Sequence, residues 1–126
     1  MPRKTYSSPS AKAVGPYSHA VETGKLLFLS GQTPLDPATG KLVEGGIKEQ
    51  TAQCLKNLFA VLGASGLGSD DVVKTNVFLT DMSEFAAMNE VYAAAFASPY
   101  PARSTIGVAA LPLGARVEIE LVAERR

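Results

Sequence analysis

The sequence predicts one α+β domain spanning residues 1–126, in which a mixed β-sheet carries two α-helices on one of its faces. Two stretches repeat their apolar residues every three or four positions, as amphipathic helices do. Shorter stretches either alternate apolar and polar residues or are continuously apolar, which is typical of strands. These segments succeed one another as a hairpin, a helix, a strand, a helix and a final pair of strands. A chain of 126 residues without repeats or linkers is long enough for one core.

The N-terminal part predicts an extended arm followed by a hairpin. Residues 1–13 are polar and show no periodicity, so we expect them to be extended. Gly15-Pro16 interrupts the chain before a short strand over residues 17–22. The turn Thr23-Gly24-Lys25 then leads into a strand over residues 26–30. Because its first four residues are apolar on both faces, we expect this strand to be covered on both sides.

The first helix is predicted over residues 47–62, after a loop over residues 34–46 that has a turn at residues 36–40. Gly63 and Gly66 should end this helix, because glycine readily takes the left-handed conformation that terminates helices. The apolar residues of its buried stripe are Ile47, Cys54, Leu55, Leu58, Val61 and Leu62. Cys54 is therefore expected to be a core residue.

A strand over residues 72–79 precedes the second helix. Asp81 and Glu84 have the spacing of a capping box, which predicts that the helix starts there. Its buried residues recur at steps of three and four, and they are Phe85, Met88, Tyr92 and Phe96. The helix should stop before Pro99, because proline cannot continue it.

The C-terminal region predicts a second hairpin that starts at Arg103. Pro99 and Pro101 fix the backbone ahead of this arginine and exclude a helix, so Arg103 opens an extended run. A Pro-Gly turn within residues 111–114 then returns the chain into a strand over residues 116–121. We expect this last strand to be the hairpin partner of the run at Arg103.

Strict alternation on the last strand separates its charged residues from its apolar ones. Arg116, Glu118 and Glu120 share one face, and Val117, Ile119 and Leu121 share the other. The predicted hairpin would thus set the Arg103 guanidinium beside a carboxylate. A guanidinium fork suits a carboxylate ligand, and a nearby carboxylate can activate water. The residues alone also allow a strand-end arginine paired with an acid, and a solvated carboxylate face.

Composition and charge exclude several classes of protein. Lys and Arg number 12, as do Asp and Glu, and no basic run is longer than the two residues Arg125-Arg126, which argues against nucleic-acid binding. With one cysteine and one histidine, a single chain can form neither an internal disulfide nor a His/Cys metal cage, so we expect no metal. The first ten residues lack an apolar signal segment, and no apolar run could span a membrane. These features predict a cytoplasmic location.

The predicted architecture leaves one sheet face without cover. Two helices cover one face of a sheet of this size, yet the other face also carries apolar side chains. A second layer is missing from the chain, so we expect another copy of the chain to supply it.

Four motifs carry a resemblance to a known family. They are Pro101-Ala-Arg-Ser104, the Leu-Pro step followed by the Val-Glu-Ile-Glu strand, Gly15-Pro-Tyr-Ser18, and Leu29-Ser-Gly-Gln32. Together, with the elements in the family's order over nearly the whole chain, they resemble the RidA (YjgF/Rid) family. The resemblance implies a cofactor-free enamine/imine deaminase with the family's fold. It also implies a homotrimer whose active sites lie between subunits, and small 2-imino and 2-keto carboxylates as ligands.

The same resemblance implies roles for individual residues. Arg103 would hold the substrate carboxylate, and Glu118 would position or activate the attacking water. Because Glu120 faces the same way, the sequence alone does not separate it from Glu118. The remaining positions that match the family's pocket are Tyr17, Ser30, Gly31, Asn89 and Thr105. Tyr17 could instead be a core aromatic residue, and Asn89 could instead have a capping or interface role.

Three positions depart from the family pattern. Thr105 stands where many members have cysteine, which keeps the backbone carbonyl thought to meet the substrate nitrogen but removes the thiol. Gly107 replaces a common glutamate and could alter the substrate range. His19 stands where glutamine is frequent, and a lone histidine is more often structural than catalytic.

The implied reaction is hydrolytic deamination of 2-aminoacrylate and of 2-imino acids such as 2-iminopropanoate and 2-iminobutanoate, which yields 2-keto acids and ammonia. Two alternatives come from other classes. One is a non-enzymatic ligand-binding or regulatory trimer on the same scaffold, because a fold does not determine a function. The other is an endoribonuclease, against which the zero net charge argues.

Overall fold

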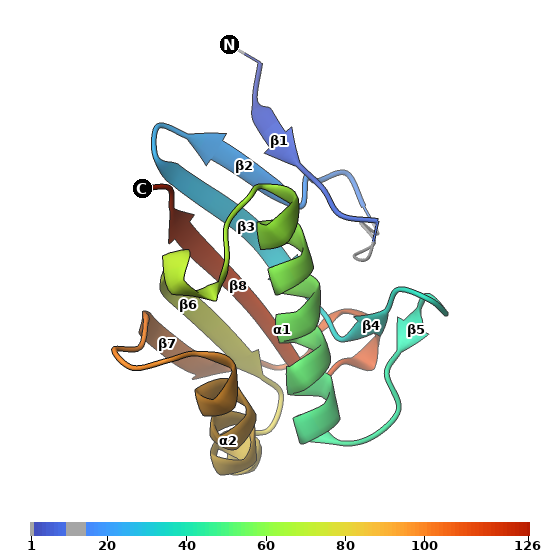
Figure 1. The fold of residues 1–126 in the computed structure, drawn as a ribbon. Coiled ribbons are helices and arrows are strands. Elements are labelled where there is room, and N and C mark those ends of the chain that lie inside the picture. Colours follow the sequence, from blue (N-terminus) through green and yellow to red (C-terminus); the bar gives the residue numbers. More distant parts are fainter. Residues whose placement is uncertain (1, 10–14) are drawn as a thin grey trace.

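The fold, described here from a computed structural model, covers residues 2–9 and 15–126 (Figure 1). In this part of the chain six strands form one sheet in the order β1-β2-β3-β8-β6-β7. The strands are β1 (Lys4–Tyr6), β2 (Ala20–Thr23), β3 (Leu26–Gln32), β6 (Val72–Leu79), β7 (Ala102–Gly107) and β8 (Val117–Glu124). Neighbouring strands are antiparallel except β6 and β7, which are parallel. The predicted mixed sheet is therefore confirmed.

Helices α1 (Ile47–Ala64) and α2 (Phe85–Ala95) lie on the same face of this sheet (Figure 1). A small separate hairpin of β4 (Leu35–Asp36) and β5 (Lys41–Leu42) lies within the predicted loop. Short 3₁₀ turns follow at η1 (Ser69–Asp71), η2 (Met82–Glu84) and η3 (Pro112–Gly114). None of the helices in the described residues is both long enough and apolar enough to cross a membrane.

The core lies between α1, α2 and the sheet. On β8 the alternation is as predicted, with Val117, Ile119 and Leu121 buried under the helices while Glu118 and Glu120 are half-buried on the other side. Cys54 is fully buried on α1, as expected, with its Sγ 3.7 Å from the Val117 carbonyl oxygen. The side of the sheet away from the helices is called the open face, and its side chains include Phe28, Asn76, Phe78, Glu118, Glu120 and Val122.

The expectation that the first long strand is covered on both sides is not met within one chain. Leu27 and Leu29 are buried toward the helices, but Phe28 between them is 46% exposed on the open face. No second layer covers this face within the described residues (Figure 1). A pleated strand with one covered face alternates in burial even where its sequence is continuously apolar.

The predicted hairpin between the strand at Arg103 and the last strand is wrong. Strand β7 lies at the sheet edge and pairs in parallel with β6, whereas β8 lies between β3 and β6. The reason is the helix in between: α2 provides the crossover that parallel strands require, so β6, α2 and β7 form one β–α–β unit. Long-range pairing thus overrides the local turn signal within residues 111–114.

Several element ends differ from the sequence prediction. The arm predicted over residues 1–13 contains strand β1, which pairs with β2, and its residues 1 and 10–13 lie outside the described part. The strand predicted over residues 17–22 begins at Ala20, so Tyr17 lies in the preceding loop. The strand predicted to end at residue 30 continues to Gln32, with a register irregularity between Leu29 and Gln32.

The helix ends show which capping signals operate. Gly66, with φ of +81°, ends α1: its N–H donates to the Gly63 carbonyl, and that of Leu67 to the Leu62 carbonyl. Asp81 caps η2 by accepting from the Ser83 N–H at 2.9 Å. Helix α2 itself begins at Phe85. The predicted capping box does not form, because the Glu84 carboxylate pairs with Arg116 at 2.8 Å instead.

Candidate active site

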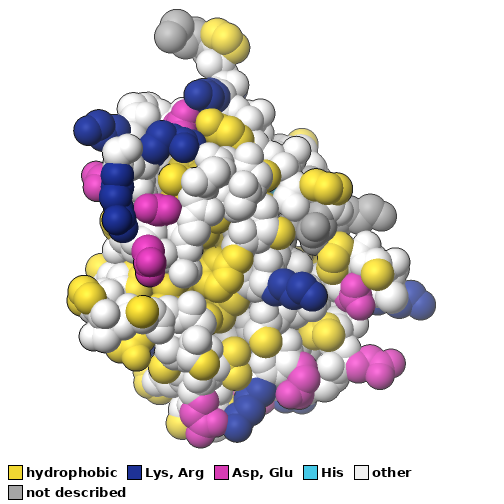
Figure 2. Space-filling view, viewed as in Figure 1, with side chains coloured by type: hydrophobic (Ala, Val, Ile, Leu, Met, Phe, Trp, Pro, Cys, Tyr) yellow, Lys and Arg dark blue, Asp and Glu magenta, His cyan; other side chains and the backbone are white. Residues whose placement is uncertain are grey.

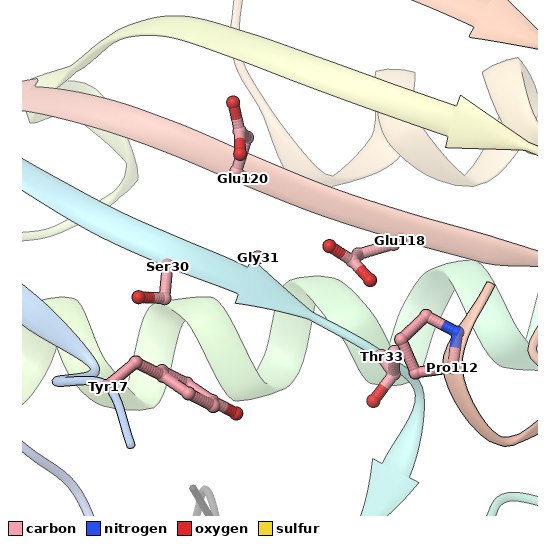
Figure 3. Close-up of a pocket in the computed structure, with 7 residues that line it drawn as sticks. All are labelled: Tyr17, Ser30, Gly31, Thr33, Pro112, Glu118 and Glu120. Carbon is pink, nitrogen blue, oxygen red and sulfur yellow. The ribbon is translucent and has the colours of Figure 1, made fainter. Parts of the chain in front are cut away.

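A cavity of about 350 Å³ opens on the open face where β3 and β8 approach η3 (Figure 3). Its lining residues are Tyr17, Ser30, Gly31, Thr33, Pro112, Glu118 and Glu120. Strand β8 supplies the carboxylates, and the irregular end of β3 supplies Ser30 and Gly31. The structure therefore brings together four of the residues predicted from the sequence: Tyr17, Ser30, Gly31 and Glu118.

Glu118 lies against Gly31 in this cavity (Figure 3). A side-chain carbon added at Gly31 would stand 3.0 Å from Cδ of Glu118 and 3.2 Å from its Cγ, and it would overlap a carboxylate oxygen. No hydrogen-bond partner for this carboxylate exists among the residues that the structure describes. Burial raises the pKa of the Glu118 carboxyl above its ordinary value, and the charge of Glu120 raises it further. The carboxylate is thus placed to exchange protons with a bound molecule.

Glu120 is held differently from Glu118. Its Oε2 accepts a hydrogen bond of 3.0 Å from the side-chain amide of Asn76, which lies opposite it on β6. In Figure 3 its carboxylate points away from β3, whereas that of Glu118 points toward it. The geometry thus separates two carboxylates that sequence alternation could not.

Ser30 fixes the loop that carries Tyr17. Its hydroxyl donates to the Ser18 carbonyl at 2.6 Å, and its N–H donates to the His19 carbonyl at 2.9 Å. Tyr17 is 40% exposed and lines the cavity, so its alternative assignment as a core aromatic residue is wrong.

A second cavity, of about 420 Å³, surrounds Arg103 near α2. Its lining residues are Asn89, Tyr92, Ala93, Tyr100, Pro101 and Arg103. The guanidinium carbon of Arg103 lies 4.7 Å from the centroid of the Tyr92 ring and 5.6 Å from that of Phe85. Aromatic faces attract cations, and they leave the N–H groups of a guanidinium available to a ligand.

No carboxylate pairs with Arg103 within residues 2–9 and 15–126, so the alternative of a strand-end ion pair finds no support there. The Tyr92 hydroxyl lies 2.7 Å from Oγ1 of Thr75, which ties the ring beneath the arginine to β6. The cation is therefore held in place by rings rather than neutralised by an acid.

Thr105 and Asn89 belong to the Arg103 side. Thr105 lies two residues beyond Arg103 on the same face of β7, and its Oγ1 is buried without a hydrogen-bond partner in the described part of the chain. Asn89 lines the Arg103 cavity from inside α2 rather than from either end, so its alternative capping role is wrong.

The two groups of predicted residues lie on opposite faces of the sheet. Arg103 stands beside Thr75, whose side chain is buried toward the helices, whereas Glu118 stands beside Phe78 on the open face. The expectation that Arg103 and Glu118 are neighbours within one chain is therefore wrong. Each face carries one half of the predicted residue set.

Two of the positions that depart from the family pattern have structural explanations. His19 is buried, and its Nδ1 accepts a hydrogen bond of 3.3 Å from the Ser8 N–H, which gives it a structural role. A side-chain carbon at Gly107 would stand 3.0 Å from Cγ of Met82, so the methionine occupies the space beside this glycine. No three His, Cys, Asp or Glu side chains in the described residues gather to hold a metal ion.

Sequence reasoning missed Thr33 and Pro112 of the first cavity, Ala93 and Tyr100 of the second, and Asn76, which donates to Glu120. Asn76 alternates with the buried residues Thr75 and Val77, so the period of β6 could have placed it on the open face. Pro112 and Thr33 depend on how η3 and the end of β3 meet, and no local pattern encodes that contact.

Fold and site define a class: an α+β protein whose sheet presents a carboxylate cavity on one face and an arginine cavity on the other. A family model described as Endoribonuclease L-PSP matches residues 7–125. The chain belongs to this family, the RidA (YjgF/Rid) family.

Relatives match nearly end to end. The RutC family protein y4sK of Sinorhizobium fredii is 52% identical over 121 residues, which are 96% of this chain and 94% of that protein. The 2-iminobutanoate/2-iminopropanoate deaminase of Mus musculus is 48% identical over 122 residues, 96% of this chain and 90% of that protein. The crystal structure of RidA from an Antarctic Psychrobacter has a TM-score of 0.93 and 47% identity, with 97% of this chain and 99% of that one covered.

Proposed function

We propose that this protein hydrolyses short 2-imino acids, including the imine forms of 2-aminoacrylate and its four-carbon homologue, to 2-keto acids and ammonia. One observation carries the proposal. The half-buried Glu118 carboxylate has no hydrogen-bond partner in the described residues and faces a cavity large enough for such a substrate. Relatives named 2-iminobutanoate/2-iminopropanoate deaminase, at 46–48% identity, support the substrate class.

The proposal includes a homotrimer with active sites between copies. In one chain Arg103 and Glu118 lie on opposite faces of the sheet, so a complete site needs a second copy. The open face with its exposed Phe28 is the surface that a neighbouring copy would cover. The Arg103 half, with Asn89 and Thr105, would then meet the Glu118 half of the neighbour, with Tyr17, Ser30 and Gly31.

The chemistry follows from the two halves. Arg103 binds the substrate carboxylate with two parallel hydrogen bonds and thereby fixes the position of C2. Glu118 takes a proton from water as the water oxygen bonds to C2, the C=N electron pair moves to the nitrogen, and the protonated Glu118 passes this proton to the nitrogen. The hydroxyl proton of the carbinolamine then moves through Glu118 to the nitrogen as the C–N bond breaks, so ammonia leaves and the 2-keto acid remains. A backbone carbonyl near Thr105 or Gly31 accepts a hydrogen bond from the substrate nitrogen.

The side chains supply the acid–base work themselves, so we propose that no metal or cofactor takes part. Imines hydrolyse readily in water, and positioning with modest acid–base help suffices. Exhaustive chelation should leave turnover unchanged. We also propose a cytoplasmic location, in keeping with a single buried cysteine.

The family description names an endoribonuclease, but the surface argues against nucleic-acid binding. Basic and acidic side chains are interspersed on the face shown in Figure 2, and the net charge is zero. Nucleic-acid binding relies on concentrated positive charge.

The test is direct. A pyridoxal-phosphate dehydratase acting on serine or threonine generates the imine in the presence of semicarbazide, which traps it. We expect the protein to lower the yield of the trapped imine and to speed up keto-acid formation in proportion to its concentration. Equal yields with and without the protein would refute the proposal and favour a ligand-binding role.

A further inference from the structure

We propose that Asn76 and Glu120 are positioning residues for Glu118: the Asn76 amide fixes the Glu120 carboxylate, which keeps a second negative charge beside Glu118 in the same cavity. The proposal rests on the proposed function of Glu118. It assigns to Glu120 a role that does not require contact with the substrate.

The first support is the arrangement on β8. Glu118 and Glu120 are two residues apart on one face of this strand and line the same cavity. Same-face neighbours on a strand lie roughly 7 Å apart, close enough for their charges to interact when water is partly excluded. Figure 3 shows the Glu118 carboxylate turned toward Gly31 and that of Glu120 turned away. The two carboxylates are thus neighbours that do not share a proton.

The second support is the partner of Glu120. Asn76 lies directly opposite it in the β6–β8 register, and its Nδ2 donates to Oε2 at 3.0 Å. A neutral amide stabilises and orients an ionised carboxylate without cancelling its charge, whereas a lysine would cancel it. The nearest cation on the same face of β6, Lys74, donates to Oγ of Ser104 at 3.3 Å.

The other described groups around the two carboxylates are either uncharged or bonded elsewhere. Phe28, Ser30 and Gly31 on β3 are uncharged. Arg116, just ahead of β8, is paired with Glu84 at 2.8 Å. Within one chain, the titratable or charged groups near the carboxylates are Tyr17 before β2, Lys74 on β6, Arg116 ahead of β8 and Cys54 on α1. In the proposed trimer, the Arg103 of a neighbouring copy would face Glu118 as well.

The consequence concerns proton transfer. Burial and then the Glu120 charge raise the pKa of Glu118. A carboxylate with a raised pKa is a stronger base and is more readily reprotonated near neutral pH. The Asn76–Glu120 pair would thus tune the group that handles the protons of water and substrate.

The experiment measures the Glu118 carboxyl titration by ¹³C NMR in the resting protein, with the signal assigned from Glu118→Gln. Glu120→Gln removes the charge and keeps the shape. We expect it to lower the pKa of Glu118 by about half a pH unit to one unit. The matched control is Glu124→Gln, the same change at an exposed residue on the same strand, which should leave the titration in place. Asn76→Leu removes the amide that holds the Glu120 carboxylate and should lower the pKa of Glu118 by less than Glu120→Gln does.

An unchanged Glu118 titration in Glu120→Gln would overturn the inference, as would equal shifts in Glu120→Gln and Glu124→Gln. Because the titration needs no turnover, it separates this inference from the proposed function. A shift in a protein that hydrolyses no imine would refute the proposed function and leave the coupling in place. In an active protein, the acidic limb of kcat/KM should move with the Glu118 titration.

Discussion

The carboxylate of Glu118 occupies the space above Gly31 in which any other residue would place its side chain. The contact joins β8 to β3 at the point where their register is irregular. Because Gly31 has no side chain, the Glu118 carboxylate can point into this space without a hydrogen bond to hold it there.

Gly31→Ala should therefore displace the Glu118 carboxylate. The new methyl carbon would stand 3.0 Å from the Glu118 Cδ, so the carboxylate must turn away. We expect kcat for imine hydrolysis to fall by roughly 10²–10⁴-fold, as for loss of a general base. The control is Gly63→Ala inside α1, where an added carbon meets nothing within 4 Å. Full activity in Gly31→Ala would show that Glu118 is not held by this contact.

Substitution of the two carboxylates should distinguish their roles. Glu118→Gln should lower kcat by roughly 10²–10⁴-fold with a smaller change in KM, because it removes the proton acceptor. Glu120→Gln should have a milder effect, because Glu120 is bound to Asn76 and acts through its charge. Steady-state kinetics on an imine generated in situ checks this. If Glu120→Gln proves the more damaging, the catalytic assignment moves two residues along β8.

Arg103→Lys should keep the fold and lose most of the turnover. Lysine retains the charge, but it cannot form two parallel hydrogen bonds to a carboxylate or present a flat cation to the Tyr92 ring. Arg103→Ala should lose at least as much, on the order of 2–4 kcal/mol of transition-state stabilisation. Thermal melts beside the kinetics provide the control. Near-normal turnover in the lysine variant would remove Arg103 from the mechanism.

Mixing two inactive variants should restore activity if the site forms between copies. Arg103→Ala retains an intact Glu118 half, and Glu118→Gln retains an intact Arg103 half. After joint unfolding and refolding at equal amounts, about a quarter of the sites of a random cyclic trimer combine both intact halves. Each variant refolded alone is the control. An inactive mixture with trimers present would contradict a site shared between copies.

The raised pKa of Glu118 also predicts a pH-dependent cost in stability. An acid with a higher pKa in the folded state binds its proton more tightly there than in the unfolded state. Its contribution to the free energy of unfolding is therefore complete below its ordinary pKa of 4.5 and is lost as the pH rises through the pKa of the folded state. Glu118→Gln should therefore become more stable relative to the parent protein as the pH rises above 4.5. Urea unfolding at several pH values measures this. A stability difference independent of pH would contradict the raised pKa.

Local patterns predicted those parts of the structure that local physics determines. The stripe of α1, the stop at Gly66 and the alternation on β8 depend on nearest neighbours along the chain. The pairing partner of β7 depends instead on the crossover helix α2, which allows β7 to pair in parallel with β6. The turn signal at residues 111–114 therefore predicted the wrong partner.

The candidate site divides in the same way. The alternation put Glu118 and Glu120 on one face, but the hydrogen bond from Asn76 and the space above Gly31 depend on pairing between distant strands. The side of the sheet on which Arg103 lies also followed from the parallel register with β6. Residue types could be predicted from the sequence, whereas their separation into two halves could not.

The space above Gly31 offers a criterion for sorting relatives by their sequences alone. In a homologue with a side chain at this position of β3, that side chain fills the space that the Glu118 carboxylate occupies here, so a glutamate on β8 must point elsewhere. Within the family, glycine here together with glutamate at the position of Glu118 should mark the branch that performs this chemistry. Homologues that have lost the glycine should also have lost the glutamate, and the reverse, because the glycine serves only to make room for the glutamate.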